Sequence, residues 1–290
     1  MAKAKKEKME PNPFKLKKEL PRLPGYIIVT LWTAFIFCMI GWIILASLST
    51  TKEIFTGSLL ASGLHFENYT KALFTNKAAL NLLNSVIYTV PSCILIIVVC
   101  APAAYCMSRF KFRGAGLIQA LIIIGLAIPN IMIVMPLFSI VSALNLSGTH
   151  FTLIFLYTAC SVPYTTFFLL TFFKGISTSF EEAAAIDGCG PIQCFWKIMF
   201  PLAQPAIVTV SIFNFIGKWN EYFMALIFAN KSNLRPIGVG LYQTVTSMMN
   251  SGDWAGMFAS VVIVFIPTVV IYAFLSDKII SGVTAGGNKG

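Results

Sequence analysis

The chain has 290 residues, of which 57% are hydrophobic and only 11% are charged, and its mean hydropathy is +0.79. Soluble domains carry about 25% charged residues, so this composition excludes an ordinary soluble enzyme and predicts a polytopic membrane protein. The net charge is +10, but eight of the 21 basic residues lie in the first 22 positions, directly before an apolar run. This placement indicates a cytoplasmic flank of a membrane span and argues against a nucleic-acid partner.

Six apolar runs are long enough to cross a bilayer, whose hydrocarbon core of ~30 Å requires about 20 helical residues. The expected transmembrane helices are 26–48, 82–108, 117–141, 151–173, 204–228 and 256–276. The first run is too long for the apolar part of a signal peptide, and no A-x-A cleavage site follows it, so it is expected to be retained. The sequence therefore predicts an all-α protein with six transmembrane helices and membrane lipid around it.

The distribution of Lys and Arg predicts the orientation of these helices. The segments expected inside the cell hold 15 of the 21 basic residues, and they are 1–25, 109–116, 174–203 and 277–290. The segments expected outside hold 5, and they are 49–81, 142–150 and 229–255. Because basic residues concentrate in cytoplasmic loops, both termini are predicted to be cytoplasmic.

Four parts follow from this topology. They are a basic N-terminal segment (1–25), a first helix with an outer loop (26–81), a core of five helices (82–276), and a short cytoplasmic tail (277–290). The basic start and the Gly-rich finish from Thr284 to Gly290 are expected to be flexible. The outer loop is long enough for a short helix beginning near Asn68. Prolines within several spans predict kinked helices.

The usual signatures of covalent chemistry do not occur in this sequence. It contains no GxxxxGK[ST], HExxH or GxSxG motif, and its seven Cys and two His form no metal-binding pattern. We therefore expect no catalytic residues, no metal site and no enzyme activity. Span five alone holds ionisable candidates, Lys218 and Glu221, which are three apart on one helical face and are expected to pair. This weakens, without excluding, a carrier driven by an ion gradient.

The inner loop 174–203 is predicted to form two short helices joined by a turn. Ser179 and Glu182 fit a capping box at the start of the first helix. Gly188 fits the position just after its end, and Pro191 fits the first position of the second helix. A compact helical hairpin held under the membrane predicts a docking surface.

At this loop the sequence resembles a family. Glu182-Ala183-Ala184, Asp187-Gly188, Phe195, Ile198 and Pro201 resemble the EAA motif of permease subunits in binding-protein-dependent ABC importers. The run from Tyr105 to Gly114 resembles the loop between spans two and three of these permeases. Trp219-Asn220-Glu221-Tyr222 resembles their W-N-E-[FY] signature, and residues 282–290 are similar to the tails of the carbohydrate, MalG-like branch.

The resemblance implies a MetI-like permease fold in a bacterial cytoplasmic membrane. It also implies four kinds of partner: a second homologous permease, two ATPase subunits that carry ATP and Mg, an extracytoplasmic solute-binding protein, and a carbohydrate substrate, expected to be an oligosaccharide. This chain would bind no cofactor. The segment 174–203, named the EAA loop below, would seat in an ATPase subunit and drive alternating access.

Three groups of residues are carried over as candidate sites. The ATPase-coupling group is Glu181, Glu182, Ala183, Ala184, Asp187 and Gly188. The translocation path or gate is Asn214, Lys218, Trp219, Asn220, Glu221 and Tyr222. The contact with the binding protein is Met248, Met249, Asn250, Ser251, Gly252 and Asp253.

The first two groups also have a plainer interpretation that stays open. Glu182 can serve as a helix cap alone, and the polar side chains of span five can serve as hydrogen bonds between helices. The alternative functions are an ABC permease for a non-sugar solute such as glycerol phosphate, a gradient-driven secondary transporter, and a scaffold subunit. An anionic solute would favour basic residues along the path, and only Lys218 qualifies.

Overall fold

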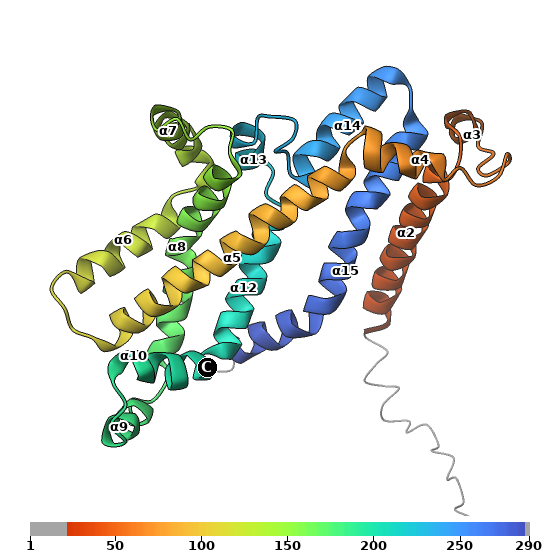
Figure 1. Cartoon of the computed structure of the whole chain (residues 1–290). Coiled ribbons are helices and arrows are strands. Elements are labelled where there is room, and N and C mark those ends of the chain that lie inside the picture. The colour runs from red at the N-terminus through yellow and green to blue at the C-terminus, as the bar shows by residue number, and fades with distance from the viewer. Residues whose placement is uncertain (1–21, 288–290) are drawn as a thin grey trace, which may run out of the picture.

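The computed structural model describes residues 22–287, with side chains through 274, and within these ranges it contains helices and no strand (Figure 1). Most of the predicted basic N-terminal segment and the last three residues of the tail lie outside the described residues. Four helices are long and apolar enough to cross a membrane. They are α2 (Leu23–Ser47), α5 (Ala78–Arg109), α8 (His150–Lys174) and α15 (Trp254–Gly287). They confirm the first, second, fourth and sixth predicted spans.

The backbone of α15 continues as helix through Gly287. Residues 277–287 of the predicted tail are therefore helical, and the end of the Gly-rich stretch lies outside the described residues.

The third predicted span is broken. α6 (Ala115–Ala127) and α7 (Asn130–Ala143) meet at 107°, so the expectation of one helix over 117–141 was wrong. Ile128 and Pro129 are extended, with ψ of 116° and 130°. The cause is local, because a proline ring disfavours helical backbone at the residue before it.

The fifth predicted span is also interrupted. α12 (Gln204–Trp219) ends before Asn220, and a separate short helix, α13 (Phe223–Phe228), follows, so a continuous helix over 204–228 was wrong. The helical segment Pro191–Leu202, which precedes α12, is bent from it by 72°. The count of spans reaches six when each of the two bent pairs, α6 with α7 and Pro191–Leu202 with α12, is taken as one span.

The helices place two groups of short elements at opposite ends of the bundle (Figure 1). One group, the EAA end, holds α9 (Ser179–Ile186), α10 (Pro191–Cys194), the π-helical turn η3 (Phe195–Met199) and α11 (Phe200–Leu202). The other group, the α14 end, holds α3 (Thr51–Thr56), α4 (Glu67–Thr70), the π-helical turn η2 (Lys71–Thr75) and α14 (Ile237–Ser251). The start of α2 and the end of α15 both lie toward the EAA end. The helix expected near Asn68 is α4 with η2.

α5 and α8 form the most extensive helix contact in the described structure. Small side chains line the inner part of this packing, among them Cys100, Ala101 and Ala104, all fully buried. Small residues let helix backbones approach closely, which is how helices associate where lipid removes the hydrophobic driving force. By contrast, α2 exposes almost all of its large apolar side chains and packs mainly on α15.

Candidate functional site: the EAA loop and the helix break

The EAA loop folds as a helical hairpin. Gly188 has φ of +78°, and its N–H donates to the carbonyl of Ala185 while Cys189 donates to Ala184. This left-handed ending of α9 confirms the expectation for Gly188, because a side chain there would be strained. Pro191 is the first residue of α10, as expected.

The predicted capping box in this loop was wrong. The residue before the first turn of α9 is Thr178, and its side chain makes no cap hydrogen bond. Ser179 lies inside the helix, where its N–H donates to Ser177 Oγ. Glu182 therefore has no capping partner at Ser179, and its side chain is exposed.

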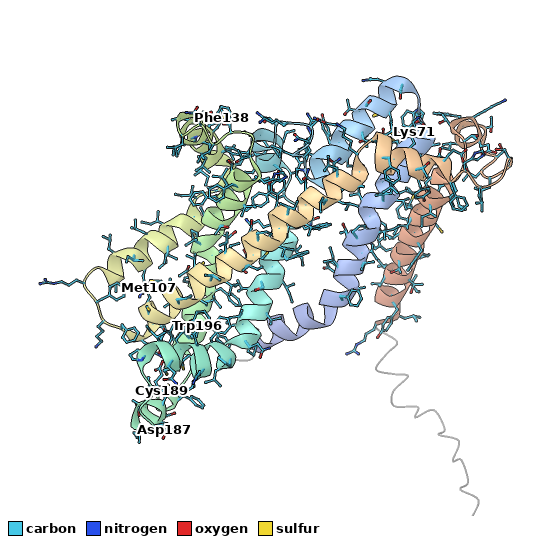
Figure 2. The ribbon with its side chains drawn as sticks, viewed as in Figure 1. Lys71, Met107, Phe138, Asp187, Cys189 and Trp196 are labelled. Carbon is cyan, nitrogen blue, oxygen red and sulfur yellow. The ribbon has the colours of Figure 1, made fainter. Side chains whose placement is uncertain are left out.

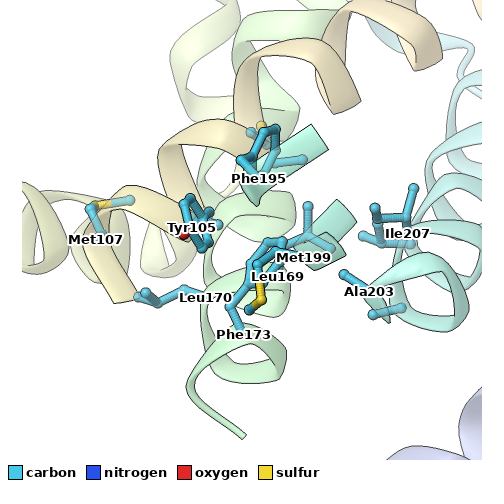
Figure 3. Close-up of a cluster of buried hydrophobic side chains, with 14 of the residues drawn as sticks. Tyr105, Met107, Leu169, Leu170, Phe173, Phe195, Met199, Ala203 and Ile207 are labelled. Carbon is cyan, nitrogen blue, oxygen red and sulfur yellow. The ribbon is translucent and has the colours of Figure 1, made fainter. Parts of the chain in front are cut away.

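Aromatic packing anchors the loop to the membrane helices. Phe195 is 5% exposed, and its ring centroid lies 5.0 Å from that of Tyr105 and 6.5 Å from that of Phe173. Figure 3 shows these rings together with Met199 in one buried cluster. Ala184, on the inward face of α9, is also buried. Phe195 of η3 thus fixes the second half of the EAA loop to the ends of α5 and α8. Ala184 brings α9 into the same buried cluster.

The opposite face of the hairpin is uncovered. Ile186 is 87% exposed and Ile192 is 77% exposed. The side chains of Glu182, Ala183 and Asp187 are exposed beside them. Figure 2 shows Asp187 at the extremity of the molecule, beyond the long helices. Exposed apolar side chains rimmed by carboxylates are typical of a protein–protein contact.

Glu181 makes a different contact from Glu182. Arg109 Nε donates to Glu181 Oε1 at 2.9 Å, and Arg109 Nη2 donates to the carbonyl of Ile176 at 2.7 Å. The two side chains are only 10% and 19% exposed. Glu181 therefore ties α9 to the end of α5. The role of Arg109 was missed, although its place in a basic loop that resembles the family was a usable signal.

Two predicted path residues tie helices together. Asn214 Nδ2 donates to Thr165 Oγ1 on α8 at 2.9 Å, and Trp219 Nε1 donates to Thr268 Oγ1 on α15 at 3.2 Å. Both residues are buried. Their geometry is that of hydrogen bonds between membrane helices.

Glu221 lies in the break after α12 and caps α13. Its two carboxylate oxygens accept from the N–H groups of Met224 at 2.7 Å and Ala225 at 2.9 Å, and from Tyr157 Oη at 2.9 Å. The expected pair of Lys218 with Glu221 was wrong, since no ion pair joins them within the described side chains. The reason is that the helix ends between them, so they do not share a helical face.

Lys218, Asn220 and Tyr222 occupy the borders of this break. Lys218 Nζ lies 5.4 Å from the ring centroid of Tyr157, a cation–π contact. Asn220 is exposed, and the ring of Tyr222 lies 5.8 Å from that of Tyr242 on α14. Of the predicted path residues, Lys218 and Asn220 retain polar groups that are not used to join helices.

The predicted contact segment 248–253 forms the end of α14 and the turn into α15. Met248 is buried, and Gly252 has φ of +75°. Lys71 Nζ donates to Asp253 Oδ2, and the N–H of Gly256 donates to Asp253 Oδ1. Burial raises the pKa of Asp253, but these hydrogen bonds outweigh it and the pKa is lowered overall.

Four residues of this segment stay uncovered. They are Met249, Asn250, Ser251 and Gly252. No cluster of His, Cys, Asp or Glu among the described residues could hold a metal ion.

Residues 94–284, which include the EAA loop and the break after α12, match the family described as binding-protein-dependent transport system inner membrane component. The chain belongs to this family. It is accordingly a multi-pass protein of the inner membrane, and a subunit of a transport system that depends on a solute-binding protein.

Known relatives cover nearly the whole chain. The diacetylchitobiose uptake permease NgcG of Streptomyces coelicolor is 30% identical over 90% of this chain and 87% of its own length. The trehalose/maltose permease MalG of Thermococcus litoralis is 30% identical over 94% of this chain and 98% of its own. A bacterial ABC transporter that imports the acidic polysaccharide alginate contains a chain of the same fold. The two chains align with a TM-score of 0.75 and 24% identity. The match covers 88% of this chain and 96% of the chain from the alginate transporter.

Proposed function

We propose that this chain is the permease subunit of an ATP-driven importer of carbohydrate, and that its EAA end faces the cytoplasm. The uptake of diacetylchitobiose by one relative and of trehalose and maltose by another supports the substrate class. The observation that carries the proposal is the uncovered face of the EAA loop, where Ile186 and Ile192 project beside Glu182 and Asp187. That face fits a cleft in an ATPase subunit.

The coupling is mechanical. α9 seats in one of two ATPase subunits, which hold ATP and Mg, and this chain performs no covalent chemistry. Glu182 and Asp187 remain available for hydrogen bonds to the ATPase. Glu181 does not contact the ATPase but transmits its movement, because Arg109 locks α9 to α5. The aromatic cluster around Phe195 carries the same movement into α8. Closure of the ATPases therefore rotates the bundle as a rigid body against a second permease.

The path for the sugar runs along the break after α12 in this proposal. Lys218 and Asn220 offer polar groups there, and Tyr222 offers an aromatic face, whereas the ring of Tyr157 is buried and contacts Lys218. Asn214, Trp219 and Glu221 support that wall by joining or capping helices. On the opposite side, the uncovered surface that meets the binding protein consists of Met249, Asn250, Ser251 and Gly252.

The test is reconstitution of the complete transporter in vesicles, with ATP hydrolysis and sugar uptake measured together. Ile186→Asp is expected to abolish recovery of the ATPase with the permease and to reduce uptake at least tenfold, because a charge replaces an apolar contact. The matched control is Phe74→Asp at the α14 end. Phe74 is 75% exposed, so both variants place a charge at an exposed apolar site.

Two results would contradict the proposal. Uptake that continues without ATP and without partners would make the chain a gradient-driven carrier. Uptake of glycerol phosphate, with no uptake of sugars, would leave the importer class standing and overturn the substrate class.

A further inference from the structure

A polar cavity of about 230 Å³ lies at the α14 end, between the start of α5, the loop 229–236 and α14. It is separate from the uncovered residues at the end of α14. The polar side chains of its lining include Asn76, Lys77, Asn81, Arg235, Gln243 and Thr244. This lining includes two cations and three amides, and no carboxylate. The cavity is therefore suited to a ligand that accepts hydrogen bonds.

The donors of this cavity are not all used within the chain. Asn76 Nδ2 is buried and has no hydrogen-bond partner. The guanidinium of Arg235 donates through Nη1 to Gln243 Oε1, which occupies that amide oxygen. Lys77 precedes α5 and provides no side-chain cap, so the positive end of a 32-residue helix adjoins the cavity. Unused donors beside positive charge favour an anionic ligand.

The cavity is fixed in place before any ligand arrives. Asn84 Nδ2 donates to the carbonyls of Asn233 at 2.8 Å and Arg235 at 3.1 Å, and Tyr88 Oη donates to Leu234 at 2.6 Å. The loop that carries Arg235 is thus held by buried side chains of α5. A preformed site loses little conformational entropy on binding.

The acidic groups near this end are already engaged. Ser62 donates to Glu53, Glu67 lies 2.5 Å from His65, and Lys71 pairs with Asp253. Lys77, in the cavity lining, is an exposed cation without an ion pair among the described side chains. The surface therefore complements a partner that presents carboxylates.

We infer that this cavity receives a carboxylate side chain from the solute-binding protein. The inference rests on the proposed function, in which the α14 end faces out of the cell. It assigns Lys77 and Arg235 to recognition of the binding protein, in addition to the uncovered residues 249–252.

The experiment titrates the solute-binding protein into the complete transporter in lipid nanodiscs. Lys77→Gln and Arg235→Gln are each expected to weaken binding about tenfold, since each removes a charge-assisted hydrogen bond. Thr244→Glu, which places a carboxylate in the cavity, should weaken it further. Lys52→Gln is the matched control, because it removes an exposed lysine of the same end outside the cavity. The affinity of the Lys52→Gln transporter for the binding protein should equal that of the unsubstituted transporter.

Equal binding by the unsubstituted and cavity variants would overturn the inference, as would equal weakening by Lys52→Gln. Glucuronate, titrated without the binding protein, tests the other source of a carboxylate. Saturable binding of glucuronate that is lost in Lys77→Gln would make the cavity a site for a free anion and would also overturn it. The proposed function fails in a different way, when the unsubstituted transporter neither hydrolyses ATP nor takes up sugar.

Discussion

The two ends of the molecule are stabilised by different chemistry. At the EAA end, the rings of Tyr105, Phe173 and Phe195 pack together, and one ion pair fixes α9. At the α14 end, side chains of α5 such as Asn84 and Tyr88 hydrogen-bond to the backbone of the loop before α14. The two surfaces assigned to partners differ in the same way, since the EAA loop exposes Ile186 and Ile192 and the cavity at the α14 end is lined by Lys77 and Arg235. Apolar contacts suit a partner that stays bound, and polar contacts suit one that must leave.

The largest expected effect concerns the ion pair at the EAA end. Arg109→Gln leaves Glu181 without its partner in a site where both side chains are largely buried. Loss of one member of such a pair is expected to cost about 2–3 kcal/mol and to lower the thermal midpoint of unfolding by several degrees.

Uptake of sugar per ATP hydrolysed should fall as well, because α9 is no longer locked to α5. The reversed pair, Arg109→Glu with Glu181→Arg, should restore most of both quantities. Lys111→Gln, at an exposed position of the same loop, is the control. A coupling ratio that is unchanged in Arg109→Gln would show that the aromatic cluster alone transmits movement.

A smaller effect is expected at the helix break. Glu221→Ala removes the acceptor for two N–H groups at the start of α13 and for Tyr157. Loss of such a cap costs about 1–2 kcal/mol, measured as a shift in the thermal unfolding midpoint in detergent. Asn220→Ala, at the exposed neighbouring position, should change stability little. Equal shifts in the two variants would rule out the capping role.

The smallest effect concerns the α14 end and depends on pH. Hydrogen bonds from the Ser62 hydroxyl and the Thr50 N–H lower the pKa of Glu53 from 4.5 to about 2. A carboxyl whose pKa is lowered on folding stabilises the fold above its unfolded value and loses that contribution as pH falls toward its folded value. The segment 51–62 should therefore loosen between pH of about 4.5 and 2.

Amide hydrogen exchange of segment 51–62 in the unsubstituted protein and in Glu53→Gln tests this expectation. The two proteins should differ at about pH 5 and converge as the pH approaches about 2, because protonation removes the charge that the variant already lacks. A constant difference across this range would show that Glu53 does not titrate there.

Much of the fold was predictable because hydropathy and length identify membrane helices directly. The breaks at Pro129 and at Asn220 were not, since an average over some twenty apolar residues does not register a local turn. The proline at 129 was a usable signal that was interpreted as a kink. The sequence signal for a helix end at Asn220 was weaker, because the polar residues there are also those expected to line a transport path.

The EAA loop was predictable in outline, and its carboxylates were not. Gly188 ends one helix and Pro191 begins the next because of their own backbone preferences, and these preferences follow from residue type alone. The partners of Glu181, Glu221 and Asp253 are Arg109, Tyr157 and Lys71, which lie 64 to 182 positions away in the chain. Only the packing of distant helices brings these groups together, so a motif alone could not separate a carboxylate used inside the chain from one left for a partner.

The exposure of α2 has a consequence for synthesis. Its main helix partner, α15, comes after every other described helix in the chain, so α2 is synthesised well before the helix on which it packs. A helix that lies in the bilayer before its partner is made must be stable in lipid on every side. The exposed apolar side chains around α2 satisfy that requirement. Packing of α15 against α2 therefore follows the synthesis of the helices between them.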